Sequence, residues 1–233
     1  MLYYYLILEI DIYLQIYLLN NEKTKSGYRT FCYNKSGGSV KEEVEKLDEM
    51  IKTFQDMMKS IYYLYKNDKL AREVVLSAMI IKKTIDILAV SKYAVKNYIV
   101  TVQISLLRLL CDNCLALESV NELGIIKYMD MINNNEQVNQ IMINEEQNMS
   151  DGYLKRKVSE KYKGFDRLYK FACEGVHFSK QAIGGAFTET DDGIALNIEP
   201  GNKELKDTIK SNNNCMITVC KVIIDMLKGI VKK

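Results

Sequence analysis

The chain has 233 residues, which is enough for one domain with a sizeable hydrophobic core. Hydrophobic residues make up 48% and charged residues 27%, which excludes an intrinsically disordered protein. A net charge of +2 is too small to indicate binding to nucleic acid or to an acidic membrane by itself. The composition therefore predicts a soluble, cytoplasmic domain.

The N-terminal residues 1–20 are apolar and rich in tyrosine. They lack the basic start and the small-residue cleavage site of a signal peptide. A membrane span here would bury Glu9, Asp11 and Gln15, whereas a clean span needs about 20 largely uncharged residues. We expect residues 1–38 to form an extension, either a helix or a strand followed by a glycine-containing joint. A membrane-surface segment is the alternative.

Three long helices are predicted next. Ser39 and Glu42 form a capping box, so the first should run from residue 39 to about residue 66. The second is expected at about 69–90 and the third at about 94–119. The third is apolar nearly all round, which is typical of a helix in the middle of a bundle.

The charge then changes sign along the chain. A short helix at about 122–131 and an Asn-rich, solvated segment at 133–150 carry mainly acidic residues: Glu122, Asp130, Glu136, Glu145, Glu146 and Asp151, against Lys127. The stretch 152–170 carries mainly basic ones: Lys155, Arg156, Lys157, Lys161, Lys163, Arg167 and Lys170, against Glu160 and Asp166. Such a basic stretch, interleaved with aromatic residues, fits either a nucleic-acid backbone or the solvated face of a helix.

The C-terminal third combines helix with strand character. Residues 165–174 should be helical, and Gly175 is well placed to end that helix. Alternation of apolar residues around a turn at 191–193 predicts a β-hairpin at about 184–198. A last helix should reach about residue 230. The sequence thus predicts a mainly α fold, a bundle of about five to seven helices with one small β-hairpin, in a single domain spanning residues 39–233.

A polar stripe crosses the apolar third helix. Thr101, Ser105, Arg108 and Asp112 are spaced four, three and four residues apart, which places them on one face. A buried guanidinium has to be paired, and Asp112 lies one turn away. Either the pair is an internal salt bridge that fixes helix register, or Arg108 lines a polar pocket and binds a phosphate or carboxylate.

His177 is the only histidine and should lie just beyond the end of a helix. It is the one side chain whose ordinary pKa suits general acid or base catalysis near neutral pH. Packing at the helix end is the alternative role. The spacing of Cys111 and Cys114 occurs in metal and redox sites, but a second such pair is missing, so buried, reduced thiols are expected. The sequence predicts neither a metal site nor a cofactor.

Two segments resemble a known group of proteins. The segment Leu107–Asn113 resembles the arginine-bearing core helix of a loose group of uncharacterised bacterial all-helical proteins, and Tyr169–His177 is similar to that group's Tyr…Val-His signature. The group usually has serine where Cys173 stands, and the resemblance covers about residues 70–200. In outline it is similar to HEPN-type bundles, found among bacterial toxins and phage-defence proteins.

The resemblance implies two functions. Some HEPN proteins are metal-independent ribonucleases that use an arginine and a histidine on one helix, whereas Arg108 and His177 lie on different predicted elements. In a ribonuclease, Arg108 would stabilise the phosphate and His177 would move the proton, with Asp112 and Glu174 beside them. RNA would then contact residues such as Ser105, Lys155, Arg156, Lys157 and Arg167.

The other function is that of an interaction module, in which Arg108 and Asp112 are structural. Its partner would be an unknown protein, or the chain would self-associate, and its setting would be a bacterial stress or phage-defence system. We favour this hypothesis over the ribonuclease and do not expect a membrane partner.

Overall fold

Seven α-helices make up most of the described chain in the computed structural model. The structure describes residues 38–67, 71–144, 147–176, 187–190, 193–196 and 205–231. All of them belong to one compact unit, residues 37–233. The predicted extension, residues 1–38, lies almost wholly outside the described residues and stays a prediction.

The helices follow one another with few interruptions. Their bounds are α2 Gly38–Leu64, α3 Arg72–Lys96, α4 Val100–Leu123, α5 Ile125–Asn133, α6 Asp151–Lys161, α7 Phe165–Val176 and α9 Lys206–Val231, with a 3-10 turn, η1, at Val138–Gln140.

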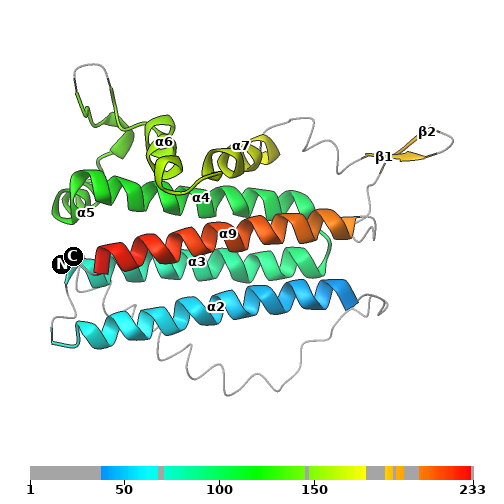
Figure 1. Ribbon diagram of the computed structural model, residues 1–233, viewed down its shortest axis with the longest axis horizontal. Coiled ribbons are helices and arrows are strands. Elements are labelled where there is room, and N and C mark those ends of the chain that lie inside the picture. The colour runs from blue at the N-terminus through cyan, green and yellow to red at the C-terminus, as the bar shows by residue number, and fades with distance from the viewer. Residues whose placement is uncertain are drawn as a thin grey trace. The chain divides into compact units, whose positions relative to one another are not determined.

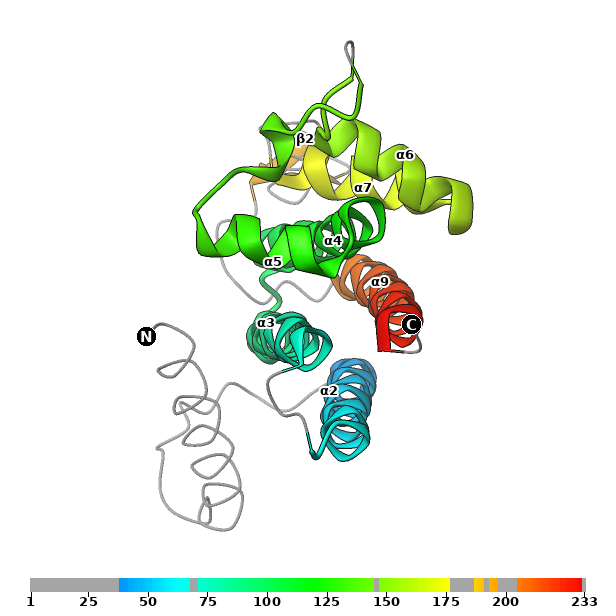
Figure 2. The same ribbon diagram turned by 90° about the vertical axis from the view of Figure 1, so that its left-hand side faces the viewer.

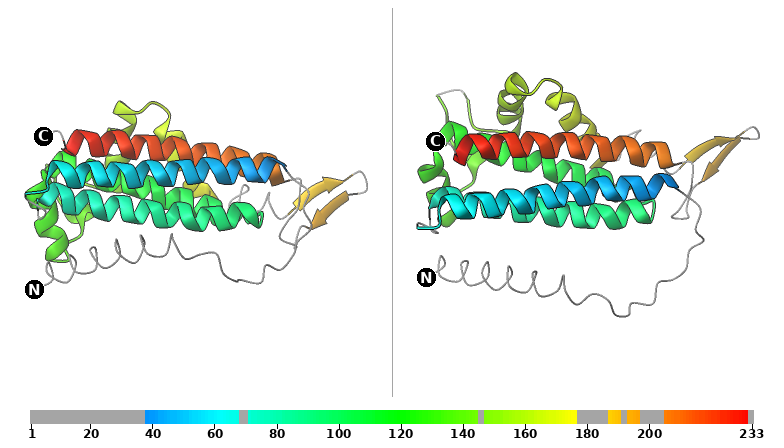
Figure 3. Two further views of the ribbon diagram at one scale, coloured as in Figure 1. Left: turned by 90° about the horizontal axis from the view of Figure 1, so that it is seen from below. Right: turned by 60° about the horizontal axis from the view of Figure 1, so that its bottom comes forward.

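Four long helices, α2, α3, α4 and α9, lie side by side as a bundle (Figures 1 and 3). Seen from the end, α2 contacts α3 and α9, and α4 contacts the same two helices from the other side (Figure 2). The chain colours in Figure 1 show that α2, α4 and α9 run in one direction and α3 in the opposite one. Such a bundle needs a long connection between two of its parallel helices.

That connection carries α5, α6 and α7. Helix α4 ends at one end of the bundle and α9 begins at the other, so the intervening chain has to return along the bundle (Figure 1). Helix α5 turns off at Gly124, whose φ of 77° is readily adopted by glycine. Helices α6 and α7 then lie along the outer side of α4.

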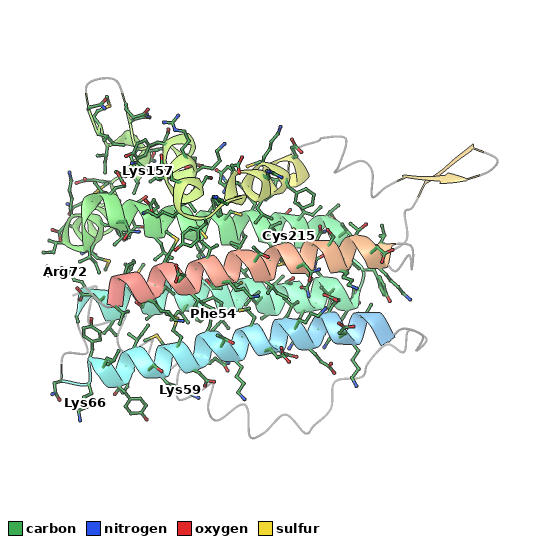
Figure 4. All side chains as sticks on the ribbon, viewed as in Figure 1. Phe54, Lys59, Lys66, Arg72, Lys157 and Cys215 are labelled. Carbon is green, nitrogen blue, oxygen red and sulfur yellow. The ribbon has the colours of Figure 1, made fainter. Side chains whose placement is uncertain are left out.

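The core follows from the apolar pattern of each helix. In α2 the buried residues Leu47, Ile51, Phe54 and Ile61 recur at helical spacing, and Phe54 points from α2 into the bundle (Figure 4). Helix α4 is apolar on several faces because it contacts α3, α9, α6 and α7. Within the described part of the chain, α4 is the one helix long and apolar enough to cross a membrane, and 61% of its most apolar window is buried inside the protein.

Polar side chains are also buried between the long helices. The amide nitrogen of Asn213 donates to the backbone oxygen of Glu43 at 3.0 Å and to its carboxylate at 2.7 Å. The neighbouring Asn212 is fully buried as well, but neither atom of its amide has a hydrogen-bond partner among the described residues. Two adjacent asparagines of α9 therefore differ in how well their polar groups are satisfied.

We expect Asn212→Leu to raise the free energy of unfolding by about 1–2 kcal/mol, because a buried polar group without a partner carries its full desolvation cost. Asn213→Leu is the matched control. It should lower the free energy of unfolding by about 2 kcal/mol, because it removes bonds to a buried carboxylate. Urea unfolding followed by circular dichroism measures both. If Asn212→Leu destabilised the protein as much as Asn213→Leu does, the conclusion that the Asn212 amide lacks hydrogen-bond partners would be contradicted.

The prediction of a mainly helical bundle is confirmed, with seven α-helices among the described residues, but some boundaries were wrong. The break between the second and third predicted helices lies at 97–99, where Tyr98 has a φ of 56°, because Ser91, Ala94 and Val95 are buried and continue α3. Gly175 was expected to end its helix. It lies within α7 instead, and it is buried against Ile104 of α4.

The predicted fold class also needs correction, because it counted a β-hairpin as part of the domain. The segments β1 (Phe187–Thr190) and β2 (Gly193–Leu196) pair with each other in antiparallel register, but neither belongs to the elements that pack closely in the bundle. Among the described elements, only the helices pack closely on one another, so the hairpin is not part of the bundle. Alternation of apolar residues favours local pairing, whereas a sheet that adds to a core needs more strands or a helix beneath it.

Candidate functional site

A group of interacting charged and polar side chains surrounds Arg108, in the middle of α4. Its guanidinium faces α6 and α7, and its side chain is 19% exposed. Helix α4 holds Arg108 at this position because two leucines of the same turn, Leu107 and Leu110, are fully buried. The arginine therefore projects from a rigid core helix.

Three side chains meet the guanidinium. Nη1 forms an ion pair with Asp112, one turn further along α4. Nη2 lies 3.2 Å from Oδ2 of Asp151, the first residue of α6, and 2.5 Å from the hydroxyl oxygen of Tyr169 on α7. We call Arg108, Asp112, Asp151 and Tyr169 the Arg108 cluster. It joins three helices through one cation.

Tyr169 makes two further contacts within the Arg108 cluster. The guanidinium carbon lies 4.2 Å from the centroid of the tyrosine ring, within the range of a cation–π contact. The hydroxyl donates to Asp151 over 3.1 Å. Burial raises the pKa of Tyr169 well above its ordinary value, and the charge of Asp151 adds to this while Arg108 opposes it. The hydroxyl therefore stays protonated at neutral pH and keeps this donor role.

Other polar contacts fasten α6 to the bundle. Lys161 lies 2.6 and 2.8 Å from the two carboxylate oxygens of Glu118, a fully buried residue of α4. The hydroxyl of Tyr153 donates to Glu122 at 2.6 Å, which raises its pKa to about 12. These contacts hold α6 along α4 independently of the Arg108 cluster.

The predicted Arg108–Asp112 pair is present. Glu174 lies on α7 and pairs with Lys170 at 3.8 Å. Ser105 is exposed and donates to the backbone oxygen of Thr101 at 3.0 Å. His177 lies outside the described residues, so its distance from Arg108 stays open.

Of the predicted binding residues, Ser105 lies on α4, three lie on α6 and Arg167 lies on α7. Arg156 and Arg167 are exposed, and Lys155 and Lys157 are partly exposed. The aromatic residues interleaved with them contact the cations: Lys155 lies 5.9 Å from the ring centroid of Tyr169. Arg156 lies 6.0 Å from that of Tyr153.

The sequence analysis missed Asp151, Tyr169 and the Glu118–Lys161 pair as members of this region. Glu118 could have been predicted to need a partner, because it is an acidic residue inside an otherwise apolar stretch of α4. The positions of Asp151 and Tyr169 beside Arg108 could not be predicted from local sequence, because they depend on how α6 and α7 fold back on α4.

Three of the five described cysteines fit the expectation of buried, reduced thiols, whereas Cys173 and Cys215 are partly exposed. Cys111, Cys114 and Cys220 are fully buried and free. Burial raises the pKa of Cys111 to about 12, so its thiol is protonated and unreactive at neutral pH. In the described ranges no group of three or more His, Cys, Asp or Glu side chains is arranged to hold a metal ion.

A shallow hollow lies where α4 turns into α5. Its volume is about 540 Å³, and its lining is mainly apolar. It is lined by residues 123–127 and by Asp130, Met131, Asn134 and Glu136. Ile126, on its rim, is 58% exposed. This is a surface that can receive an apolar side chain.

Comparison of the chain with protein-family models, with curated proteins and with solved structures found no match.

Proposed function

We propose that the chain is a helical interaction module. The observation that supports this best is the pairing of Arg108. Its charge is met by Asp112 and Asp151, and Tyr169 covers its face and takes a further hydrogen bond. A phosphate would have to displace two carboxylates to bind there. The guanidinium instead serves to hold α6 and α7 on α4.

A rigid platform results from these contacts. The surface formed by α5, the following segment and α6, residues 124–144 and 147–161, is called the α5–α6 surface below. Three apolar side chains on it are exposed: Ile126 at 58%, Met142 at 56% and Ile143 at 38%. The segment around Met142 is itself ordered by backbone bonds, including one of 2.8 Å from the amide of Ile143 to the carbonyl of Gln147. Exposed apolar side chains on ordered backbone favour a protein partner.

Site-specific photo-crosslinking in the native host tests the proposal. A photoreactive amino acid is placed at Ile126 or Met142 and, as a control, at Lys52 or Lys59 of α2. Figure 4 shows Lys59 on the side of α2 that faces away from the bundle. We expect discrete protein adducts from the first pair only. Absence of adducts at Ile126 and Met142, or equal adducts at all four positions, would contradict an interaction module that uses this surface.

The alternative is a metal-independent, HEPN-like ribonuclease that uses Arg108 and His177. It is tested by incubating purified protein with several RNAs, with and without EDTA, beside Arg108→Ala and His177→Ala. We expect no cleavage by the folded wild type. Cleavage that survives EDTA and is lost in both folded variants would establish the ribonuclease instead. A place in a bacterial stress or phage-defence system is part of the proposal and rests on the family resemblance alone.

A further inference from the structure

Positive charge gathers on the outer side of α6 and α7. Residues 151–176, all of which the structure describes, contain seven basic side chains and four acidic ones. Three of the basic side chains are held in ion pairs with carboxylates of the protein, including Lys161 with Glu118. The other four form no ion pair with any described residue and are called the α6–α7 surface: Lys155, Arg156, Lys163 and Arg167.

The cations of the α6–α7 surface point away from the bundle. Arg156 lies midway between Leu154 and Val158, which are both buried. Because a helix turns by about 200° over two residues, the exposed side chain of Arg156 points to the opposite side. Arg167 has the same position between two buried aromatic residues of α7. Since α6 and α7 pack against each other along α4, their cations share one outward side (Figure 2).

Tyrosine rings help to fix these cations in place. The guanidinium of Arg156 lies 6.0 Å from the ring centroid of Tyr153, and it also donates to the side chain of Gln147 at 3.3 Å. The ammonium of Lys155 lies 5.9 Å from the ring centroid of Tyr169. Both tyrosines donate in turn to carboxylates of the protein. A partner therefore meets cations that are partly positioned before it binds, which lowers the entropic cost of binding.

A partner for this surface has to supply negative charge. We infer that the partner of the interaction module carries an acidic segment, rich in Asp and Glu, which binds along the α6–α7 surface. Arginine suits such a partner because its guanidinium can bind a carboxylate through two hydrogen bonds. The inference rests on the proposed interaction module, whose partner it specifies, and it uses α6, which also belongs to the α5–α6 surface.

Asp166 favours a protein segment over a nucleic acid as the source of that charge. It is exposed, forms no ion pair with a described residue, and lies between Lys163 and Arg167 in the sequence. A phosphate backbone carries negative charge alone and would be repelled at this position. A protein segment can place a basic residue opposite Asp166 and acidic residues opposite the cations around it.

Fluorescence anisotropy of the purified full-length chain tests the inference, with a labelled oligoglutamate as the probe. We expect the oligoglutamate to bind, and its dissociation constant to rise at least about tenfold between about 50 and about 500 mM NaCl. A labelled RNA with the same number of charges should bind less than about ten times as tightly as the oligoglutamate, whereas RNA binding tighter than that overturns the inference in favour of a nucleic acid. Absence of oligoglutamate binding at protein concentrations up to about 100 µM at low salt overturns it as well.

Charge reversal locates the binding on the two helices. Lys155→Glu/Arg156→Glu reverses the part of the surface on α6, and Lys163→Glu/Arg167→Glu reverses the part at the start of α7. Each variant should raise the dissociation constant for oligoglutamate at least about tenfold. Circular dichroism confirms that each variant is folded.

Lys52→Glu/Lys66→Glu is the matched control, because it changes the net charge by the same amount. Both lysines are exposed, and α2, which carries Lys52 and ends just before Lys66, lies on the opposite side of the bundle from α6 and α7 (Figure 1). The control should change the dissociation constant by less than about twofold. Equal weakening by all three double variants overturns the inference, because net charge alone would then explain the binding.

Photo-crosslinking at Ile126 separates failure of this inference from failure of the proposed function. In the native host, Lys163→Glu/Arg167→Glu should lower the yield of protein adducts at Ile126 at least about tenfold, and the control should leave it unchanged. Adducts that persist at full yield in both reversal variants overturn the inference and leave the interaction module intact. Absence of adducts at Ile126 in the wild type removes the proposed function, together with the partner that the inference specifies.

Discussion

Replacing Lys161 with methionine is expected to lower the free energy of unfolding by about 3 kcal/mol, since it leaves a buried carboxylate without its counter-charge. Glu118 is fully buried, and after the change its remaining partner among the described contacts is the amide of Asn121, at 3.1 Å. Methionine keeps the length of the lysine stem, so the loss reports the charge and not the packing. Denaturant unfolding monitored by circular dichroism measures the effect.

Lys163→Met is the matched control, because Lys163 is an exposed lysine two residues further on. It should change the free energy of unfolding by less than about 0.5 kcal/mol. Glu118→Gln should cost less than Lys161→Met, because a neutral amide is cheaper to bury than a lone carboxylate. The double variant should lose less than the sum of the two single losses, since both remove the same pair. A Lys161→Met protein as stable as the wild type would mean that water reaches Glu118.

Gly175→Ala is expected to destabilise the protein by about 2 kcal/mol, although alanine is the better helix former. A Cβ at position 175 would lie 1.8 Å from Cγ2 of Ile104, a buried side chain of α4. The gain in helix propensity is about 1 kcal/mol, whereas overpacking a close helix contact costs about 1–3 kcal/mol and separates α7 from α4. Urea unfolding gives the net change, and hydrogen exchange of the α7 amides locates it.

Gly229→Ala provides the comparison within the same protein. Gly229 also lies inside a helix, α9, but a Cβ there would meet nothing within 4 Å. That substitution should stabilise the protein by about 0.5–1 kcal/mol. We therefore expect the same substitution, glycine to alanine, to lower the free energy of unfolding at position 175 and to raise it at position 229. If Gly175→Ala also stabilised the protein, the close contact between α7 and α4 would be disproved.

Most of the helical framework could be predicted from the sequence, because it depends on local apolar spacing. The long faces of α2 and α9 repeat every three or four residues, and α4 is apolar enough to identify it as central. The boundary between α3 and α4 was misplaced because no proline or glycine marks it. The turn relies on Tyr98 in a left-handed conformation, which the sequence does not signal.

The candidate site was predictable only along a single helix. Asp112 could be identified as a partner of Arg108 because the two are four residues apart on α4. Asp151 and Tyr169 reach the same guanidinium from α6 and α7, and their positions depend on the way that the connection returns along α4. The close approach at Gly175 is of the same kind. Local patterns do not carry such long-range information, so the glycine was interpreted as a helix end.

The position of α9 in the bundle has a consequence for synthesis of the protein. Helix α9 contacts α2, α3 and α4, and it is the last of the described helices to leave the ribosome. Until it arrives, the three earlier helices keep open the apolar faces that α9 will cover, among them the one that includes Leu110. Contacts between segments so distant in sequence form late and slowly. The nascent chain is therefore a natural client for chaperones, which shield such faces until translation has delivered the last helix.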